Sequence, residues 1–303
     1  MFIFNFFLSS GAQTKYEKKK CSECNKIRNI SDENQQICQI CYNAKKRIIL
    51  SGNKVIDDFI RYTQTNNDKD NGKMIFVPYE KFNNIELIGE GGFSKIYKAT
   101  WIDCKIDSNL GTLDFSLLNE SKIVALKKLN DSKNVTSKEL NELRMFYHYC
   151  LSGKKFSNIY DDDDRLVNIY YGITRDPITQ DIIFIMPYYN SDLIHDIYEN
   201  FYDTSWYEKT SSLRNIISGL KEIHGVNIIH RDLHSGNILL GDYYSFFHDV
   251  PKICDLGTNN KKIKPIEDEN NDYTTIELEL DIDMNFKQSN DDEYITSEID
   301  FDI

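Results

Sequence analysis

The pattern of apolar and polar residues predicts a strand-rich stretch in the middle of the chain, followed by helices. Apolar runs bounded by turn-forming residues predict strands. Such runs lie at residues 83–89, 94–102, 121–129, 167–176 and 181–189. Apolar residues at helical spacing predict helices, and these lie at residues 48–64, 136–150 and 206–224. We therefore expect a short helix, three strands, a helix, two further strands and a long helix, in that order.

Changes in composition divide the chain into five segments. Residues 65–73 lack apolar anchors and contain the turn-forming pair Asn71-Gly72, so a domain boundary is expected near residues 70–75. The segments are an apolar, disordered N-terminus (1–14), a cysteine-containing segment (15–47), a short helix and linker (48–75), a large domain (76–258) and an acidic tail (259–303). Met1 to Leu8 has no basic region before it and is short for the core of a secretory signal, so we favour disorder or docking to a partner over a cleaved signal.

The negative charge is concentrated at one end of the chain. The 303 residues carry a formal charge of −12, and residues 267–303 contain fourteen acidic residues against Lys287. The rest is close to neutral, which permits phosphate ligands and gives little support for nucleic-acid binding. Residues 276–283 alternate apolar and acidic positions, so the tail is either solvated or forms one edge strand. No run of about 18 apolar residues occurs, and we expect neither a membrane nor a nucleic-acid partner.

Four cysteines have the spacing of a metal site. Cys21 and Cys24 form one C-x2-C pair, and Cys38 and Cys41 form a second pair, with thirteen residues between the two pairs. Each pair can place two thiolates on a tight turn, and two such turns can surround Zn²⁺ tetrahedrally. Free thiols, or disulfides in an oxidising compartment, are the alternatives. The other cysteines, at positions 104, 150 and 254, are isolated and are expected to be ordinary buried thiols.

Two motifs in the predicted strands suggest contacts with phosphates. The first is a glycine-rich turn between two strands, a context that favours a flap over phosphates rather than a dinucleotide-binding turn. Its residues are Gly89, Glu90, Gly91, Gly92, Phe93, Ser94 and Ile96. The second is Lys127, which ends the apolar run Val124-Ala125-Leu126 and needs anionic partners there. The next helix offers Glu139 and Glu142, and we favour Glu142 because Glu139 lies in the solvated first turn.

Two later motifs complete a recognisable set. The segment 230–237 (HRDLHSGN) follows the long predicted helix, and 255–257 (DLG) follows a short strand pair. With the glycine-rich turn, the strand lysine and the helix glutamate, they stand in the order of the protein kinase signature. From about residue 80 to 258 the chain resembles protein kinases. The cysteine pairs, the segment 51–64 (SGNKVIDDFIRYTQ) and the HRDLHSGN motif resemble more closely the expanded protein-kinase-like family of mycorrhizal fungi, whose catalytic domains are similar to tyrosine-kinase-like Ser/Thr kinases.

The resemblance implies a fold and a set of roles. The fold is α+β and two-lobed, with a five-stranded N-lobe that carries one helix, an incomplete helical C-lobe and a preceding zinc-ribbon-like segment. Lys127 would hold the α- and β-phosphates of ATP and Glu142 would orient Lys127. Asp232 would accept the proton of the substrate hydroxyl, while Asn237 and Asp255 would hold Mg²⁺. The adenine pocket would consist of Ile96, Ala125, Met186, Pro187, Tyr189 and Leu239.

The chain departs from the kinase pattern in three places. Ser94 replaces the third glycine of the turn and Leu256 replaces phenylalanine in the D-x-G motif, and both changes preserve size or apolar character. After Asp255 the 48 remaining residues contain no A-P-E motif and no apolar helical pattern. We therefore expect an incomplete C-lobe with an exposed apolar underside, which a protein partner would cover.

Two functions follow from these observations. The first is a cytoplasmic, signalling protein kinase that uses ATP and Mg²⁺ to phosphorylate Ser or Thr, or else Tyr, on a protein substrate. The second is a catalytically impaired pseudokinase or truncated ATP-binding interaction module. A weaker third interpretation makes the zinc segment the functional centre and the kinase part its scaffold.

Overall fold

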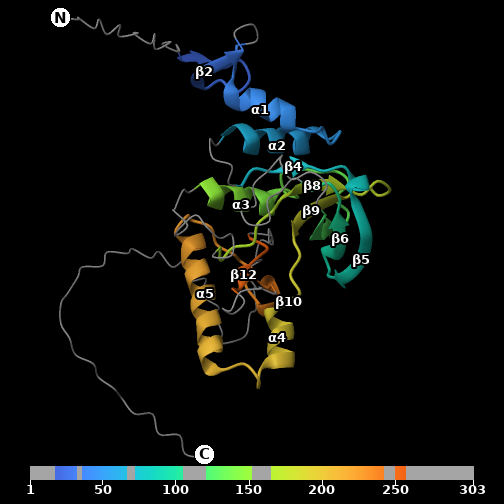
Figure 1. The fold of residues 1–303 in the computed structure, drawn as a ribbon, viewed down its shortest axis with the longest axis vertical. Coiled ribbons are helices and arrows are strands. Elements are labelled where there is room, and N and C mark those ends of the chain that lie inside the picture. Colours follow the sequence, from blue (N-terminus) through green and yellow to red (C-terminus); the bar gives the residue numbers. More distant parts are fainter. Residues whose placement is uncertain are drawn as a thin grey trace, which may run out of the picture. The chain divides into compact units, whose positions relative to one another are not determined.

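The structure is a computed structural model that describes residues 18–32, 36–66, 72–104, 121–151, 165–241 and 250–256 (Figure 1). The predicted N-terminal segment 1–14, the acidic tail and Gly257 lie outside these ranges. The elements described below all belong to one compact unit, residues 1–260.

Three short strands and a helix form the N-terminal part of the described chain. The strands β1 (Lys18–Lys20), β2 (Ile27–Asp32) and β3 (Ile37–Cys38) pair antiparallel in that order. Helix α1 (Gln39–Arg47) follows β3 directly. The four predicted cysteines and Ile37 form the core between them. We call residues 18–47 the cysteine unit.

Helix α2 (Lys54–Asn66) begins six residues later than the sequence predicts. The Asn53 side chain accepts hydrogen bonds from the backbone N–H groups of Val55 and Ile56, at 3.0 and 3.2 Å, and therefore caps the helix. Asp57 accepts in turn from the backbone N–H of Ser51 at 2.7 Å. The apolar residues before Asn53 are thus excluded from the helix by a local polar signal.

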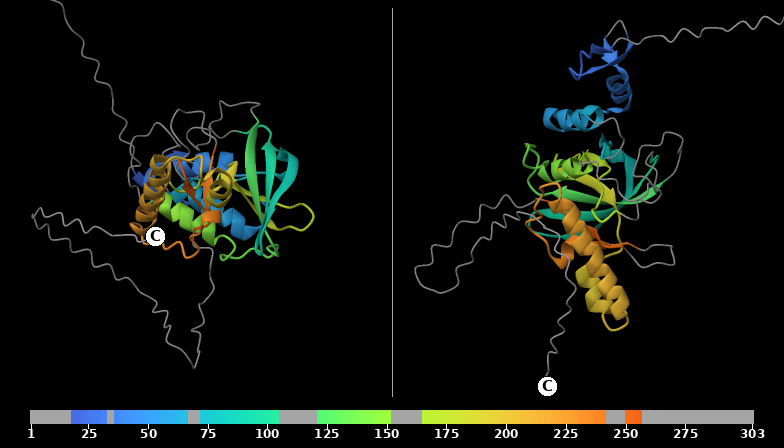
Figure 2. Two further views of the ribbon diagram at one scale, coloured as in Figure 1. Left: turned by 90° about the horizontal axis from the view of Figure 1, so that it is seen from below. Right: turned by 90° about the vertical axis from the view of Figure 1, so that its left-hand side faces the viewer.

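A six-stranded sheet forms the main body of the N-lobe (Figure 2). Its strands are β4 (Ile75–Phe76), β5 (Phe82–Glu90), β6 (Ser94–Trp101), β7 (Lys122–Leu129), β8 (Gly172–Arg175) and β9 (Ile182–Pro187). Their spatial order is β4-β8-β9-β7-β6-β5, with β4 parallel to β8 and the other pairs antiparallel. A 3₁₀ turn (Tyr79–Lys81) connects β4 to β5.

The five strands expected in the N-lobe are present, and β4 is an addition. A Cβ at Gly172 would lie 2.1 Å from the backbone oxygen of Ile75, so β4 can pair here only because residue 172 is glycine. Strand β8 is shorter than the predicted run 167–176. Its expected first residue, Val167, instead makes a parallel bridge with Ile253 in the second lobe.

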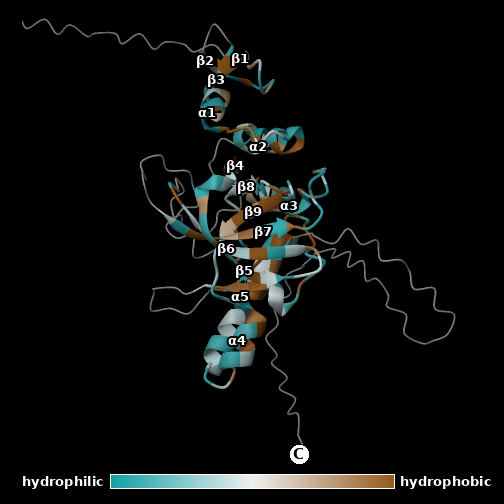
Figure 3. Cartoon of the chain, turned by 90° about the vertical axis from the view of Figure 1, so that its right-hand side faces the viewer, coloured by the Kyte–Doolittle hydropathy of each residue, from teal (hydrophilic) through white to brown (hydrophobic). Residues whose placement is uncertain are grey.

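Helix α3 (Asn141–Leu151) packs with the sheet in the largest hydrophobic cluster. Alternate residues of β7 point to opposite sides, so Ala125 joins this cluster while Val124 and Leu126 join a second cluster with Trp101. Strand β9 is hydrophobic over most of its length (Figure 3); its residues from Ile182 to Met186 are buried, and Pro187 at its end is half-buried. The helix starts later than predicted because Glu139 accepts hydrogen bonds from Thr136 N and Oγ1, both at 2.6 Å, outside the helix.

The second lobe contains two helices and a small sheet. Its elements are β10 (Ser191–Asp192), α4 (Leu193–Asn200), α5 (Trp206–His224), a 3₁₀ turn η3 (Ser235–Asn237), β11 (Ile238–Leu240) and β12 (Lys252–Ile253). The three strands pair antiparallel in the order β10-β11-β12. The bounds of α5 confirm the prediction, and Ser205 with Glu208 forms a capping box at its start.

Helices α4 and α5, with the turn between them, expose an apolar and aromatic surface. Its most exposed members are Tyr198, Tyr202, Trp206 and Tyr207, each at least 74% exposed. On α5, Leu213 and Ile217 are also exposed, whereas Ile223 is buried. Part of α5 in the described residues is therefore an exposed apolar face, as expected for the underside of the C-lobe. Within those residues, none of the helices has the length and apolar character needed to cross a membrane.

Candidate active site and metal centre

A buried ion cluster lies between the sheet and helix α3. The ammonium group of Lys127 on β7 is 3.0 Å from Glu142 Oε2 and 3.2 Å from Oε1 on α3, and 2.5 Å from Asp255 Oδ1. Lys127 is 5% exposed and Glu142 is 4% exposed. A buried charge is costly unless it is paired and hydrogen-bonded. The structure therefore brings together three of the residues predicted from the sequence, and Glu142 rather than Glu139 pairs with the lysine.

The charges of this cluster depend on one another. Burial alone lowers the pKa of Lys127, but the carboxylates of Glu142 and Asp255 outweigh it and raise the pKa above its ordinary value. Burial raises the pKa of Asp255, yet Lys127 brings it below the ordinary value. Burial raises the pKa of Glu142 to about 7 against the opposing effect of Lys127. The result is one ammonium between two carboxyl groups, of which Glu142 takes up a proton more readily.

Tyr170 is a member of this cluster that the sequence analysis missed. Its hydroxyl donates a short hydrogen bond to Glu142 Oε1. Its ring makes edge contacts with Phe146 and Phe184, at centroid distances of 5.2 and 6.2 Å. Burial first, and then the charge of Glu142, raise the pKa of Tyr170 well above its usual value, so it remains a donor. In the sequence it was one aromatic residue in a predicted strand, with no motif to single it out.

The segment 230–237 and the strand before Asp255 are joined by the buried His230. The Nε2 atom of His230 lies 2.7 Å from the carbonyl oxygen of Cys254, and the backbone N–H of Asp232 donates to Nδ1 at 3.3 Å. Since Nδ1 accepts, the proton of the neutral ring is on Nε2 and is donated to Cys254. Asp232 is half-buried next to this bridge. His230 therefore fixes the loop of Asp232 relative to Asp255.

Asn237 makes a second connection within the same loop. Its side-chain Nδ2 donates to the backbone carbonyl oxygen of Asp232 at 2.9 Å, and its backbone carbonyl oxygen accepts from the backbone N–H of Cys254 at 3.0 Å. Because the amide nitrogen is used in this way, Oδ1 is the side-chain atom that can serve a cation. Asn237 and Asp255 thus offer an amide oxygen and a carboxylate, which are the donors that Mg²⁺ prefers.

Two residues of the site have a left-handed backbone. Arg231 has φ of 67° and Asp255 has φ of 60°. This region is unusual for residues other than glycine, although aspartate enters it more readily than arginine. Such conformations persist only where the surroundings determine them, and they are frequent at functional sites. Here the His230 and Asn237 hydrogen bonds on either side supply that constraint.

The glycine-rich segment forms the turn between β5 and β6. Gly91 N donates to Ser94 O at 2.8 Å, and Glu90 pairs with Lys95 at 2.9 Å across the turn. Phe93 is 73% exposed at the tip, and its carbonyl accepts from the backbone N–H of Asn130 at 2.9 Å. Ser94 thus fits the hairpin in place of the third glycine. The turn and the neighbouring Gly89 stand where the sequence predicts them, between two paired strands.

The residues predicted to line an adenine pocket lie on four strands, β6, β7, β9 and β11, and in the segment that follows β9. In the sheet, Ile96 is paired with Lys127, and Ala125 is paired with Met186. Ile96, Ala125 and Met186 also share one hydrophobic cluster. The other predicted residues, Pro187, Tyr189 and Leu239, are half-buried and lie at the end of β9, beyond it, and on β11.

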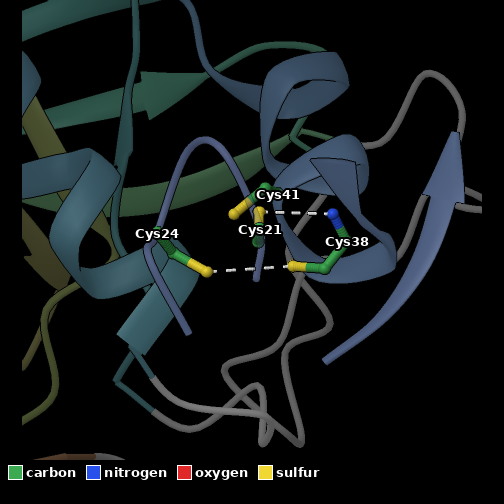
Figure 4. Close-up of side chains that lie close together, drawn as sticks. All are labelled: Cys21, Cys24, Cys38 and Cys41. Atoms are coloured by element: carbon green, nitrogen blue, oxygen red, sulfur yellow. Dashed lines mark hydrogen bonds between the residues drawn. The ribbon is translucent and has the colours of Figure 1, made fainter. Parts of the chain in front are cut away.

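The four cysteines of the cysteine unit converge (Figure 4). Their sulfur atoms all lie within 4.8 Å of one another, and Cys24 Sγ is 3.9 Å from Cys38 Sγ. Two sulfurs bound to one tetrahedral Zn²⁺ are about 3.8 Å apart, given Zn–S bonds of about 2.3 Å. All four are free thiols rather than disulfides in the described structure. The donor set and its spacing therefore fit zinc.

The thiols of this cluster differ in acidity. Burial raises the pKa of Cys21, but hydrogen bonds from the backbone N–H groups of Cys24 and Cys38 outweigh it and lower the pKa to about 6. Cys38 N is 3.3 Å from the sulfur of Cys21. Burial raises the pKa of Cys41 above its ordinary value, with further contributions from the neighbouring thiols. Cys21 therefore forms a thiolate readily, whereas Cys41 would be stabilised as a thiolate only by a bound cation.

Comparison with known proteins identifies similarity over the part of the chain that contains Lys127, Glu142 and Asp255. The family model for the protein kinase domain matches residues 112–277. A non-specific serine/threonine protein kinase from Drosophila melanogaster is 37% identical over 76 residues, which is 25% of this chain and 10% of the relative. Cyclic GMP-binding protein C from Dictyostelium discoideum is 24% identical over 215 residues, which is 61% of this chain and 7% of the relative. The chain therefore spans only a small part of each of these relatives.

Proposed function

Because the chain belongs to the protein kinase family, we propose that it binds Mg-ATP and transfers the γ-phosphoryl group to a hydroxyl of a protein substrate. The observation that carries the proposal is the buried cluster of Lys127, Glu142 and Asp255. Phosphoryl transfer requires mainly positioning and neutralisation of charge, which a fixed ammonium and carboxylate ligands can supply. The similarity to the Drosophila kinase supports Ser or Thr as the acceptor.

The residues would divide the work as follows. Lys127, oriented by Glu142, binds the α- and β-phosphates, and the β5–β6 turn covers them with backbone N–H groups. Asp255 and Asn237 hold Mg²⁺, which neutralises phosphate charge when bound. Asp232 accepts the proton of the attacking hydroxyl. The apolar residues around Ala125 and Met186 exclude water from the adenine ring.

Transfer itself is tested by mass spectrometry. The chain is incubated with Mg-ATP and a mixed protein substrate, beside an Asp232→Asn variant whose thermal stabilisation by nucleotide is also measured. New phosphosites that disappear in the variant support the proposal. Stabilisation by nucleotide without phosphosites favours the second candidate, a pseudokinase or ATP-binding interaction module. If neither phosphosites nor stabilisation by nucleotide is observed, both candidate functions are contradicted.

Finer features of the proposal rest on the sequence motifs and the exposed surface. We propose a tyrosine-kinase-like kinase of the mycorrhizal-fungal group, acting in cytoplasmic signal transduction. A protein partner on the aromatic surface of α4 and α5 is supported by the exposure of Tyr198 and Tyr202. Replacing both by serine should leave nucleotide affinity unchanged while removing cross-links between this surface and that partner.

We also propose that Cys21, Cys24, Cys38 and Cys41 hold a structural Zn²⁺. The support is the mutual approach of the four sulfurs and the burial of three of them. Four protein ligands complete the tetrahedral shell, so the ion would stabilise the cysteine unit rather than take part in catalysis. The metal content of the purified chain, measured by elemental analysis, should be one zinc per molecule.

A further inference from the structure

Helix α2 buries one continuous face, although the sequence predicts that this helix lies outside the kinase domain, in the segment 48–75. The buried residues include Ile56, Phe59, Ile60 and Thr63, each at most 8% exposed, and Gln64 beside Thr63 is also buried. The first four follow at intervals of three, one and three residues, which is one face of a helix. The three apolar ones belong to the same hydrophobic cluster as Leu143 and Phe146 of α3. Helix α2 is therefore part of the core that supports α3.

Direct contacts between the two helices centre on Tyr147. Its hydroxyl donates to the carbonyl oxygen of Thr63 at 3.3 Å, and its ring makes an edge contact with Tyr62 at 5.5 Å. Tyr147 is 2% exposed, and burial first, then Tyr62, raise its pKa to about 12. After α2, the chain passes close to α3 at Gly72. A Cβ there would lie 2.7 Å from Cβ of Cys150.

These contacts lie on the side of α3 away from its functional carboxylate. At about 100° per residue, Tyr147 is about 140° around the helix from Glu142. Glu142 reaches Lys127 on the inner side, while Tyr147 contacts α2 on the outer side. Helix α3 is therefore held between the sheet and α2. Loss of α2 would free its outer face and allow Glu142 to leave the lysine.

Helix α2 is in turn held at its C-terminal end by the cysteine unit. Lys26 Nζ donates to the backbone oxygen of Asn66 at 3.0 Å and to its Oδ1 at 2.8 Å. Arg28 Nη1 donates to the carbonyl oxygen of Thr65 at 3.2 Å. The last carbonyls of a helix lack partners within the helix, and cations there also complement its dipole. Two basic residues of the cysteine unit thus cap α2.

We propose that α2, capped by Lys26 and Arg28, is a positioning element for α3 that keeps Glu142 paired with Lys127. Only the expected effect of α2 on nucleotide affinity rests on the proposed function; its effect on the position of α3 does not. Lys26, Arg28 and Tyr147 are then positioning residues that touch neither ATP nor Mg²⁺. The cysteine unit acts on the nucleotide site from a distance, through two helices in contact.

The test compares Lys26→Met/Arg28→Met with a matched control, Lys19→Met/Lys20→Met, which removes two exposed lysines of the same unit. Amide hydrogen exchange and Mg-ATP affinity are measured on the full chain. We expect faster exchange in α3 and an affinity about tenfold weaker, as follows if the fraction of chains with α3 in place falls to about a tenth. The control should match the wild type. Lys26→Arg/Arg28→Lys, which keeps both charges, should restore most of the affinity.

Tyr147→Phe provides a second and milder variant, because it removes the bond to Thr63 and keeps the ring. It should speed exchange in α3 with unchanged exchange in β7 and β9. Unchanged α3 exchange in both variants would overturn the proposal. Equal acceleration in α3, β7 and β9 would also overturn it, because the cap would then act only on overall stability. If the wild type binds no nucleotide, the proposed function fails, while α3 exchange still decides this inference.

Discussion

Lys127 Nζ lies 2.5 Å from Asp255 Oδ1, although the two residues are 128 positions apart in the chain. This ion pair joins a strand of the N-lobe sheet to the segment after β12. The same ammonium also binds Glu142 of α3. One lysine therefore connects three separate parts of the fold, and its removal has consequences for both stability and ligand binding.

Lys127→Met is expected to lower the free energy of unfolding by about 3–5 kcal/mol, because it leaves two buried carboxyl groups without their cation. Urea denaturation at pH 8 measures this loss. Nucleotide affinity should be lost as well. Lys128→Met is the matched control, since Lys128 follows on the same strand and pairs with Asp176 at 2.6 Å instead. An equal loss of nucleotide affinity in the control would contradict the role given to Lys127.

Tyr170→Phe is expected to destabilise the folded chain by about 1.5–3 kcal/mol, the range for a hydrogen bond to a charged group. The hydroxyl of Tyr170 is one of the groups that lower the pKa of Glu142, so its loss should raise that pKa further. Urea denaturation gives the first quantity, and carboxyl titration by NMR gives the second. Tyr171→Phe is the control because Tyr171 packs in the other cluster. A titration of Glu142 that is identical in both variants would argue against the bond.

The elements that the sequence predicted well are those with strong periodic or motif signals. Strands β5, β6, β7 and β9 lie within two residues of the predicted runs, and α5 has the predicted bounds. Alternation and helical spacing reflect which side chains a sheet or helix buries, so they can be read locally. The motif residues Lys127, Glu142 and Asp255 were also found, because their types and order were recognisable.

What the sequence could not show depends on contacts between distant segments. Strand β4 has two residues and exists because Gly172 allows a close approach to Ile75. Gly72, which the sequence places in a linker, lies against Cys150 of α3 with φ of 76°. Tyr170 gains its role only from the helix placed beside it. Such pairings carry no periodic signal in either segment alone.

The stability of the chain should fall in mild acid because of His230. Burial lowers the pKa of this histidine below its ordinary value, against the raising effect of the Cys254 carbonyl. The unfolded chain takes up a proton near pH 6.5, whereas the folded chain does so only at lower pH. The unfolded state then binds more protons, so the free energy of unfolding decreases as the pH falls below about 6.5. The contribution is at most about 1.4 kcal/mol per pH unit.

Urea denaturation from pH 7.5 to pH 5 measures this dependence, with His230→Gln compared with the wild type. Glu142, whose pKa is raised to about 7, takes up a proton in the same range and has the opposite effect. The difference between the wild type and His230→Gln in the slope of the free energy of unfolding against pH therefore gives the contribution of His230. The variant should lose less stability in acid than the wild type. A slope of the free energy of unfolding against pH that is the same in His230→Gln as in the wild type would refute the assignment to His230.

Removal of zinc is expected to unfold the cysteine unit and then to weaken the nucleotide site. Structural zinc contributes about 10–16 kcal/mol to small domains, so residues 18–47 should lose protection from hydrogen exchange when a strong chelator is added. Lys26 and Arg28 would then no longer cap α2. Exchange in α3 should increase next, while β7 and β9 remain protected by the sheet.

Cys24→Ser should reproduce the effect of the chelator, because it removes one of the four ligands, whereas Cys104→Ser changes a buried thiol outside the cluster and should keep the zinc. Elemental analysis and hydrogen-exchange measurements on both variants separate two steps. The zinc content shows whether the cysteines bind the metal, and exchange in α3 shows whether loss of the metal loosens that helix. If Cys24→Ser loses its zinc while α3 stays fully protected, the zinc site is established, but the proposed effect of the cysteine unit on α3 through α2 is refuted. Zinc retained in Cys24→Ser at the wild-type level would refute the metal assignment itself, because three thiolates leave the tetrahedral shell incomplete.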